Sequence, residues 1–137
     1  MTRTPANAHA KGKNDKSREG SRVARLKALA RGEAAEAVAA LSLRLKGYRI
    51  LDRRFKTKVG EVDIIARRGG CVAFVEVKQR ATRALCEAAV TDETRTRVRR
   101  AAEVWLARHH RFNDDELRFD VIFVIPRRWP EHLIGAL

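Results

Sequence analysis

Several residue types are scarce in this 137-residue chain, and each scarcity excludes a class of protein. Its two cysteines, Cys71 and Cys86, are too few for a tetrahedral zinc cage, and Cys71 lies in an apolar run where a buried free thiol is the ordinary occupant. No stretch approaches the roughly 20 apolar residues of a membrane span, and the N-terminus lacks the apolar core of a secretory signal. We therefore expect a cytoplasmic protein with no membrane partner.

Acidic residues are also in the minority. The chain has 30 lysines and arginines against 17 aspartates and glutamates, which gives a net charge of +13. Such a surplus favours polyanions, above all nucleic acid, as partners. Residues 1–31 account for +7 of this charge and the rest of the chain for +6. The globular part is therefore basic even without its N-terminal segment.

Large apolar residues are nearly absent from the first 21 positions, which contain Pro5, Gly12 and Gly20. Such a segment cannot offset the entropy lost on ordering, so we expect residues 1–21 to be a disordered basic arm. We expect one globular domain over residues 22–126, and the structure of the C-terminal tail, residues 127–137, is left open.

Hydrophobic periodicity predicts a helix, three strands, a second helix and a fourth strand. The first firm helix runs from about Glu33 to Lys46, and Gly32 is expected to separate it from a preceding helical segment. The remaining predicted elements are strands over 48–55, 60–66 and 71–79, a helix over 92–109 and a strand over 118–125. A helical crossover implies that the last two strands pair in parallel. The fold class is α/β, with a mixed sheet flanked by helices.

Two neighbouring predicted strands carry charged side chains at alternate positions. Residues two apart in a strand point to the same face, so Glu61 shares a face with Asp63, and Glu76 shares one with Lys78. A loop of Gly69 and Gly70 would put Asp63 directly opposite Glu76, whereas a four-residue loop would put the two diagonally. Either loop brings both carboxylates to one face of the sheet.

Two adjacent carboxylates should raise each other's pKa, a cost that a divalent cation removes. Mg²⁺ suits such an all-oxygen site. On spacing alone, a cross-strand salt-bridge network of Asp63, Glu76 and Lys78 is an equally good interpretation.

The wider motifs resemble a known nuclease family. Asp63, twelve intervening residues and Glu76-Val77-Lys78 resemble the D-(x)n-E-x-K site of restriction-endonuclease-like nucleases. Five segments together are similar to the bacterial YraN-type endonuclease family: Gly32-Glu33, Gly47–Leu51, Gly60–Asp63, Phe74–Lys78 and Arg118–Val121. The resemblance covers about Gly32 to Ile125. It implies a restriction-endonuclease-like α-β-β-β-α-β core and, as in Holliday junction resolvases, hydrolysis of branched or otherwise structured DNA with Mg²⁺ or Mn²⁺.

The same resemblance implies roles for individual residues. Asp63, Glu76 and Lys78 would be catalytic, and Asp63 and Glu76 would bind the metal. Glu33, on the first helix, matches an additional acidic residue and would be a third ligand. Asp120 also matches a family position, but an acid at the start of a buried strand often bonds to a neighbouring loop or arginine, so we expect a structural role for it.

Positive side chains suggest how nucleic acid would be held. Arg54 and Thr94 stand where the family often has Asn and Lys, which leaves the substrate's shape open. Trp129, beside two arginines, could stack on a base or cover the sheet. Four arginines crowd the start of the second helix and are expected to contact DNA phosphates: Arg95, Arg97, Arg99 and Arg100.

The function expected from the sequence is therefore metal-dependent cleavage of DNA in the bacterial cytoplasm. The alternative is a nucleic-acid-binding protein with a nuclease-like fold that does not cleave. The sequence leaves a monomer and a homodimer equally open.

Overall fold

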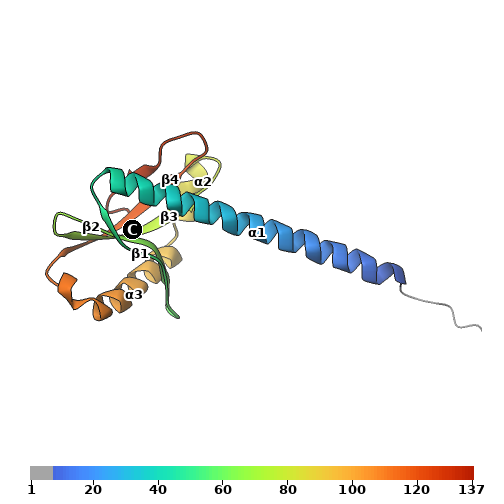
Figure 1. Cartoon of the computed structure of the whole chain (residues 1–137), viewed down its shortest axis with the longest axis horizontal. Coiled ribbons are helices and arrows are strands. Elements are labelled where there is room, and N and C mark those ends of the chain that lie inside the picture. The colour runs from blue at the N-terminus through green and yellow to red at the C-terminus, as the bar shows by residue number, and fades with distance from the viewer. Residues whose placement is uncertain (1–7) are drawn as a thin grey trace, which may run out of the picture. The chain divides into compact units, whose positions relative to one another are not determined.

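The structure is a computed structural model that describes residues 8–137, and Figure 1 shows its elements. In chain order these are α1 (Ala8–Leu45), β1 (Arg49–Lys56), β2 (Glu61–Arg68), β3 (Cys71–Gln79), α2 (Arg83–Ala89), α3 (Asp92–Arg108), the short helix η1 (His110–Phe112), β4 (Glu116–Val124) and β5 (Glu131–Leu133). The sheet order is β1-β2-β3-β4-β5, and β3 pairs with β4 in parallel while all other pairs are antiparallel. The predicted α/β fold with a mixed sheet is confirmed, with α2, η1 and β5 in addition.

The chain divides into two units, residues 1–33 and residues 34–137. The N-terminal unit corrects the sequence prediction, because α1 begins at Ala8 and runs through Gly32 without a break. Of the predicted disordered arm, residues 8–21 are helical, and residues 1–7 lie outside the part that the structure describes. Every residue from 14 to 33 is exposed. Ala, Lys, Arg and Glu favour helix without burial, and each exposed glycine costs a helix only about 1 kcal/mol.

Each face of the sheet is covered by one helix of the 34–137 unit. Small residues let α1 approach one face closely, where its buried side chains meet those of β2, β3 and β4: Ala39, Ala40, Leu43, Ile64, Ala66, Ala73, Val75 and Ile122. The opposite face packs against the apolar side of α3 through a larger cluster that includes Val62, Ile65, Val72, Phe74, Val98, Ala102, Trp105 and Val121. Trp105 is thus a core residue, as its position on the predicted helix indicated. None of the helices described is long and apolar enough to cross a membrane.

The regular alternation of faces breaks where β1 and β2 pass Arg54 and Asp63. Val62 and Ile64 are both fully buried, but Val62 packs in the α3 cluster and Ile64 in the α1 cluster. Strict alternation would put residues two apart on the same face. On β1, Arg54 has a φ of +51°, in the left-handed region that Asn tolerates better than Arg. This irregularity turns Asp63 away from both hydrophobic clusters.

The C-terminal residues 127–137, left open as a tail, belong to the domain. Strand β5 pairs with β4, and Leu137 is buried against the α3 cluster. Asp120 of β4 is fully buried and organises this junction: it accepts hydrogen bonds from Arg118 at 2.9 Å and from the backbone N–H of Gly135 at 2.9 Å, and its carboxylate lies 2.8 Å from Nε2 of His132. Arg118 also donates to the hydroxyl of Tyr48 at 2.6 Å, which ties β4 to the residue before β1. The expected structural role of Asp120 is confirmed.

Asp120 should therefore be a main determinant of stability. Burial alone would raise the pKa of Asp120, but hydrogen bonds from His132, Arg118 and Gly135 outweigh burial and lower the pKa to about 2. The stabilisation is present above the ordinary pKa of about 4 and is lost as the pH falls toward about 2. We expect Asp120→Ala to lower the free energy of unfolding by about 3–5 kcal/mol, because it leaves buried partners unpaired.

Urea unfolding at neutral pH measures this loss. Asp114→Ala, which removes an exposed carboxylate from the loop before β4, is the matched control and should change stability by less than about 0.5 kcal/mol. Equal stabilities of the two variants would contradict the role given to Asp120.

Candidate active site

A two-residue turn sets the register of the strands that carry the charged pairs. Gly69 and Gly70 have φ values of +56° and +74°, which a tight hairpin turn requires and which glycine adopts without strain. Arg68 pairs with Cys71, and the ladder continues to the pair of Ile64 and Val75. One further step of the same register puts Asp63 opposite Glu76. Of the two loops left open by the sequence, the shorter one is therefore present.

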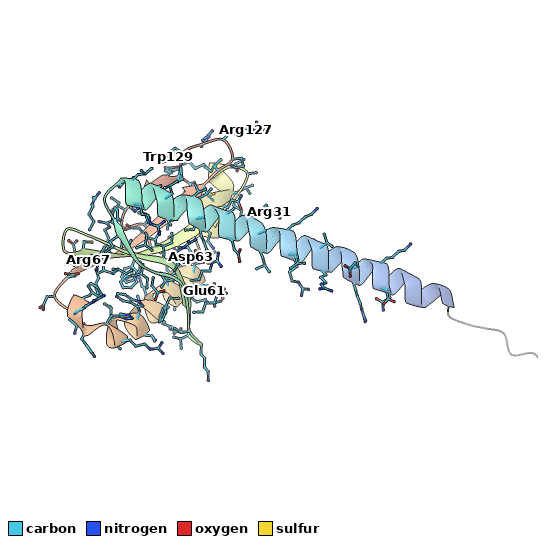
Figure 2. The ribbon with its side chains drawn as sticks, viewed as in Figure 1. Arg31, Glu61, Asp63, Arg67, Arg127 and Trp129 are labelled. Atoms are coloured by element: carbon cyan, nitrogen blue, oxygen red, sulfur yellow. The ribbon has the colours of Figure 1, made fainter. Side chains whose placement is uncertain are left out.

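Asp63, Glu76 and Lys78 meet at the end of this hairpin. The carboxylate of Asp63 accepts a hydrogen bond from the backbone N–H of Val77 at 2.8 Å, and the carboxyl groups of Asp63 and Glu76 are close enough to affect each other's pKa. Nζ of Lys78 lies 3.1 Å from Oε1 of Glu76. Figure 2 labels Asp63 and Glu61 close together on β2. The structure thus brings together all three residues that the sequence singled out as catalytic.

The carboxyl pair has few positive partners. Burial raises the pKa of Asp63, the charge of Glu76 raises it further, and the Val77 N–H compensates only in part, so the pKa is about 8. Burial also raises the pKa of Glu76, against the opposing effect of Lys78. Both pKa values are therefore raised because too little positive charge faces the two carboxyl groups. A site of this kind has the charge and the oxygen ligands to hold a divalent cation.

A polar cleft of about 250 Å³ lies between these strands and the start of α3. It is lined by Glu61, Glu76, Lys78, Glu93, Thr94, Arg97 and Val98. Gly60 allows the close approach, because a Cβ at this position would lie 1.8 Å from the carbonyl oxygen of Arg97. The cleft therefore depends on the Gly60-Glu61 pair, and it contains Thr94, one of the two departures from the family pattern. Glu93 was not singled out in the sequence, where an acid in the first turn of a helix has an ordinary capping role.

Glu36, on α1 within the 34–137 unit, is a further acid that the sequence reasoning missed. Its charge raises the pKa of Asp63, so the two carboxylates are close enough to interact. Glu36 also forms an ion pair of 2.6 Å with Nε of Arg54, on the irregular part of β1. Glu33, the predicted third ligand, belongs to the 1–33 unit, and its role stays a prediction. Glu33 and Glu36 lie three residues apart on one helix, so sequence alone could not choose between them.

The four arginines predicted to contact DNA have different surroundings. Arg97 lines the cleft beside Glu76 and Lys78. Arg95 pairs with Asp92 at 2.9 Å, and Arg100 is exposed on α3. Arg99 lies over the ring of Phe119, with its Cζ 4.3 Å from the ring centroid, and donates to the carbonyl of Leu137 at 2.6 Å. Arg99 therefore holds the C-terminus on the domain, whereas Arg97 is the one placed at the candidate site.

Comparison with known proteins establishes the family. The model of the uncharacterised protein family UPF0102 matches residues 35–124. A UPF0102 protein of Methylorubrum populi (strain ATCC BAA-705 / NCIMB 13946 / BJ001) is 55% identical over 106 residues, which cover 77% of this chain and 85% of the relative. UPF0102 protein R00337 of Rhizobium meliloti (strain 1021) is 51% identical over 112 residues, which cover 82% of this chain and 92% of the relative. The chain belongs to the UPF0102 family.

Membership in UPF0102, a YraN-like family, agrees with the resemblance that the motifs carry. The match to the UPF0102 model includes Glu36, Asp63, Glu76 and Lys78 and begins after Glu33. Among the side chains that the structure describes, no three of His, Cys, Asp or Glu are grouped as in a metal cage. Asp63 and Glu76 would hold a cation at this site, with water or a substrate phosphate among its other ligands, as Mg²⁺ commonly has.

The raised pKa of Asp63 predicts that the metal-free UPF0102 protein is more stable in mild acid. A carboxyl group whose folded pKa exceeds its ordinary value stabilises the fold fully below about pH 4, and this stabilisation is lost as the pH rises to about 8. We expect the midpoint of thermal unfolding in EDTA to be lower at about pH 8 than at about pH 5.5. Mg²⁺ should raise the midpoint at about pH 8, because it binds the folded state.

Asp63→Asn is the control for this pH dependence, since an amide keeps the shape but does not titrate. The variant should show a smaller pH difference and little response to Mg²⁺. An unchanged pH difference in Asp63→Asn would assign the effect to another group.

Proposed function

We propose that this UPF0102 protein is a metal-dependent endonuclease that hydrolyses phosphodiester bonds of DNA. The observation that carries the proposal is the pairing of two carboxyl groups on facing strands, the half-buried Asp63 and the buried Glu76, beside the ammonium group of Lys78. Acids with raised pKa values at a cleft are typical of catalytic sites, and Glu76 of this pair lines one. Mg²⁺ or Mn²⁺ bound by this pair would lower the pKa of a water molecule and offset charge on a phosphate.

The other residues of the cleft have roles that follow from their charge and position. Lys78 would hold the nucleophilic water or contact a non-bridging phosphate oxygen; its ammonium group lies 3.1 Å from the carboxylate of Glu76, which supports this role. Arg97 lines the same cleft and supplies a second cation for the phosphate. The Val77 N–H fixes the direction of the Asp63 carboxylate. From the family resemblance we retain branched or otherwise structured DNA as the substrate class. The enzyme would act as a monomer or as a homodimer.

A second cleft supports a nucleic acid as the substrate. It has a volume of about 590 Å³ and lies between the turn that joins β1 to β2 and the C-terminal half of α3. Its lining contains three cationic side chains, Lys56, Lys58 and Arg108, and no acidic one. Such a cleft suits the phosphate backbone without reading its sequence. It equally suits the alternative function, a nucleic-acid-binding protein that does not cleave.

Cleavage assays separate these two functions. With Mg²⁺ or Mn²⁺ we expect the protein to cut linear, flapped or four-way-junction DNA, and we expect EDTA to stop the reaction. Asp63→Asn, Glu76→Gln and Lys78→Met should each lower the rate by at least about a hundredfold, because each removes one functional group with little change in shape. Glu103→Gln, an exposed acid elsewhere on α3, is the matched control and should cleave at the wild-type rate. Binding without metal-dependent cleavage would favour the alternative.

Two acids of α1, Glu36 and the predicted ligand Glu33, can be compared for their effect on cation binding. We expect Glu36→Gln to weaken Mn²⁺ binding about tenfold or more, because the charge of Glu36 acts on Asp63. Calorimetric titration of Mn²⁺ into each variant measures this change. Because Glu36→Gln also breaks the ion pair between Glu36 and Arg54, the double variant Glu36→Gln/Arg54→Gln shows whether loss of that ion pair causes the weaker binding. Weakened binding in Glu33→Gln, with none in Glu36→Gln, would restore Glu33 as the ligand.

A further inference from the structure

Among the Phe, Tyr and Trp side chains that the structure describes, Trp129 alone is exposed. Its exposed fraction is 63%, whereas that of Trp105, the other tryptophan, is 1%. Of the two interpretations left open by the sequence, a cover for the sheet is therefore wrong. Trp105 stacks on His109, with ring centroids 4.0 Å apart, and its indole N–H donates to Asp52 at 3.2 Å. Trp105 is thus the tryptophan of the core, and Trp129 lies outside it.

The surroundings of Trp129 form a short positive loop between β4 and β5. Arg127 and Arg128 precede it and are exposed, and Figure 2 shows Arg127 and Trp129 on this loop. The N–H of Arg128 donates to the carbonyl of Ile125 at 3.2 Å, which closes the turn. Glu131, the first acid after the loop, is paired with Arg83 at 2.9 Å. An exposed indole beside two arginines matches a base with its phosphates better than it matches an apolar partner.

The loop lies at the same end of the sheet as the candidate active site. Strands β3 and β4 are parallel, and Lys78 pairs with Phe123 near the end of β4. Neighbouring strands are about 4.8 Å apart, so the loop begins only one strand away from the strand that carries Glu76 and Lys78. The loop that carries Trp129 therefore follows β4 at the end of the sheet where β3 carries Lys78.

We propose that Trp129, Arg127 and Arg128 form a docking point for an unpaired nucleotide, with the indole stacked on the base and the guanidinium groups on the phosphates. The inference rests on the proposed function for its partner class and adds the kind of substrate. A base inside a continuous duplex has no free face for the indole, whereas a base at a flap, gap or branch has one. DNA with a single-stranded part is thus the substrate that this domain recognises.

The test is binding of the full-length protein in EDTA to a labelled thymidine oligonucleotide and to a fully paired duplex, followed by anisotropy. Trp129→Ala should bind the oligonucleotide about 5- to 150-fold more weakly, the range found for loss of one base-stacking aromatic. Trp129→Phe should stay close to wild type, because phenylalanine also stacks. Leu117→Ala, which changes an exposed apolar residue at the start of β4, is the matched control. Duplex binding should change less than about twofold in all three variants.

Two further measurements make the result specific. Emission of the wild-type protein should be quenched by the oligonucleotide, and the quenching should vanish in Trp129→Phe, which retains only the buried Trp105. Arg127→Ala/Arg128→Ala should lower the slope of log affinity against log salt by about 1 for the oligonucleotide.

The outcomes separate this inference from the proposed function. Wild-type affinity of Trp129→Ala for the oligonucleotide, or equal losses for oligonucleotide and duplex, would overturn the docking point and leave metal-dependent cleavage untouched. Absence of binding to either DNA by the wild-type protein would overturn both.

Discussion

Partial loss of water around the facing carboxyl groups of Asp63 and Glu76, added to the repulsion between them, is the constraint on which the candidate site depends. The turn of Gly69 and Gly70 fixes the register that puts them together, and the irregularity at Arg54 turns Asp63 out of the hydrophobic clusters. The fold supplies one backbone N–H and one lysine, which is too little to keep both groups ionised. A pair held in this way favours any ligand that brings positive charge, which is why we interpret it as functional and not as a salt-bridge network.

A second buried acid in the same sheet shows that the deficit at Asp63 is not a general property of this fold. Asp120 is fully buried, yet an arginine, a histidine and a backbone N–H surround it, and its pKa falls where that of Asp63 rises. The two acids thus have opposite environments. Asp120 has every partner that a structural carboxylate needs, and its network joins β5 to β4. The surroundings of Asp63 lack compensating charge, which is typical of an acid that binds a cation or exchanges a proton.

The sequence predicted those parts of the fold in which burial and local pattern agree. Strands β1 to β4 and helix α3 appear within about two residues of their expected bounds, because apolar β-branched runs and an N-terminal Thr91 cap are local signals. Helix α1 was misjudged because an exposed helix needs no apolar periodicity. Strand β5 was missed because His132 is held there by a polar contact with Asp120. Glu36 was missed because its approach to Asp63 exists only in three dimensions.

Net charge predicted a nucleic-acid partner but not the residues that would contact it. Of the arginines at the start of α3, Arg97 faces the candidate site and Arg99 holds the C-terminus, while the cationic cleft is lined by Lys56, Lys58 and Arg108. The turn from β1 to β2 borders both clefts, because it contributes Lys56 and Lys58 to one and leads into Glu61 of the other. A phosphate backbone lying along α3 would therefore meet cations first and the paired carboxyl groups next. Binding and chemistry would then lie in different clefts. Replacement of Lys56, Lys58 and Arg108 should weaken the affinity for DNA, while the pKa of Asp63 stays raised.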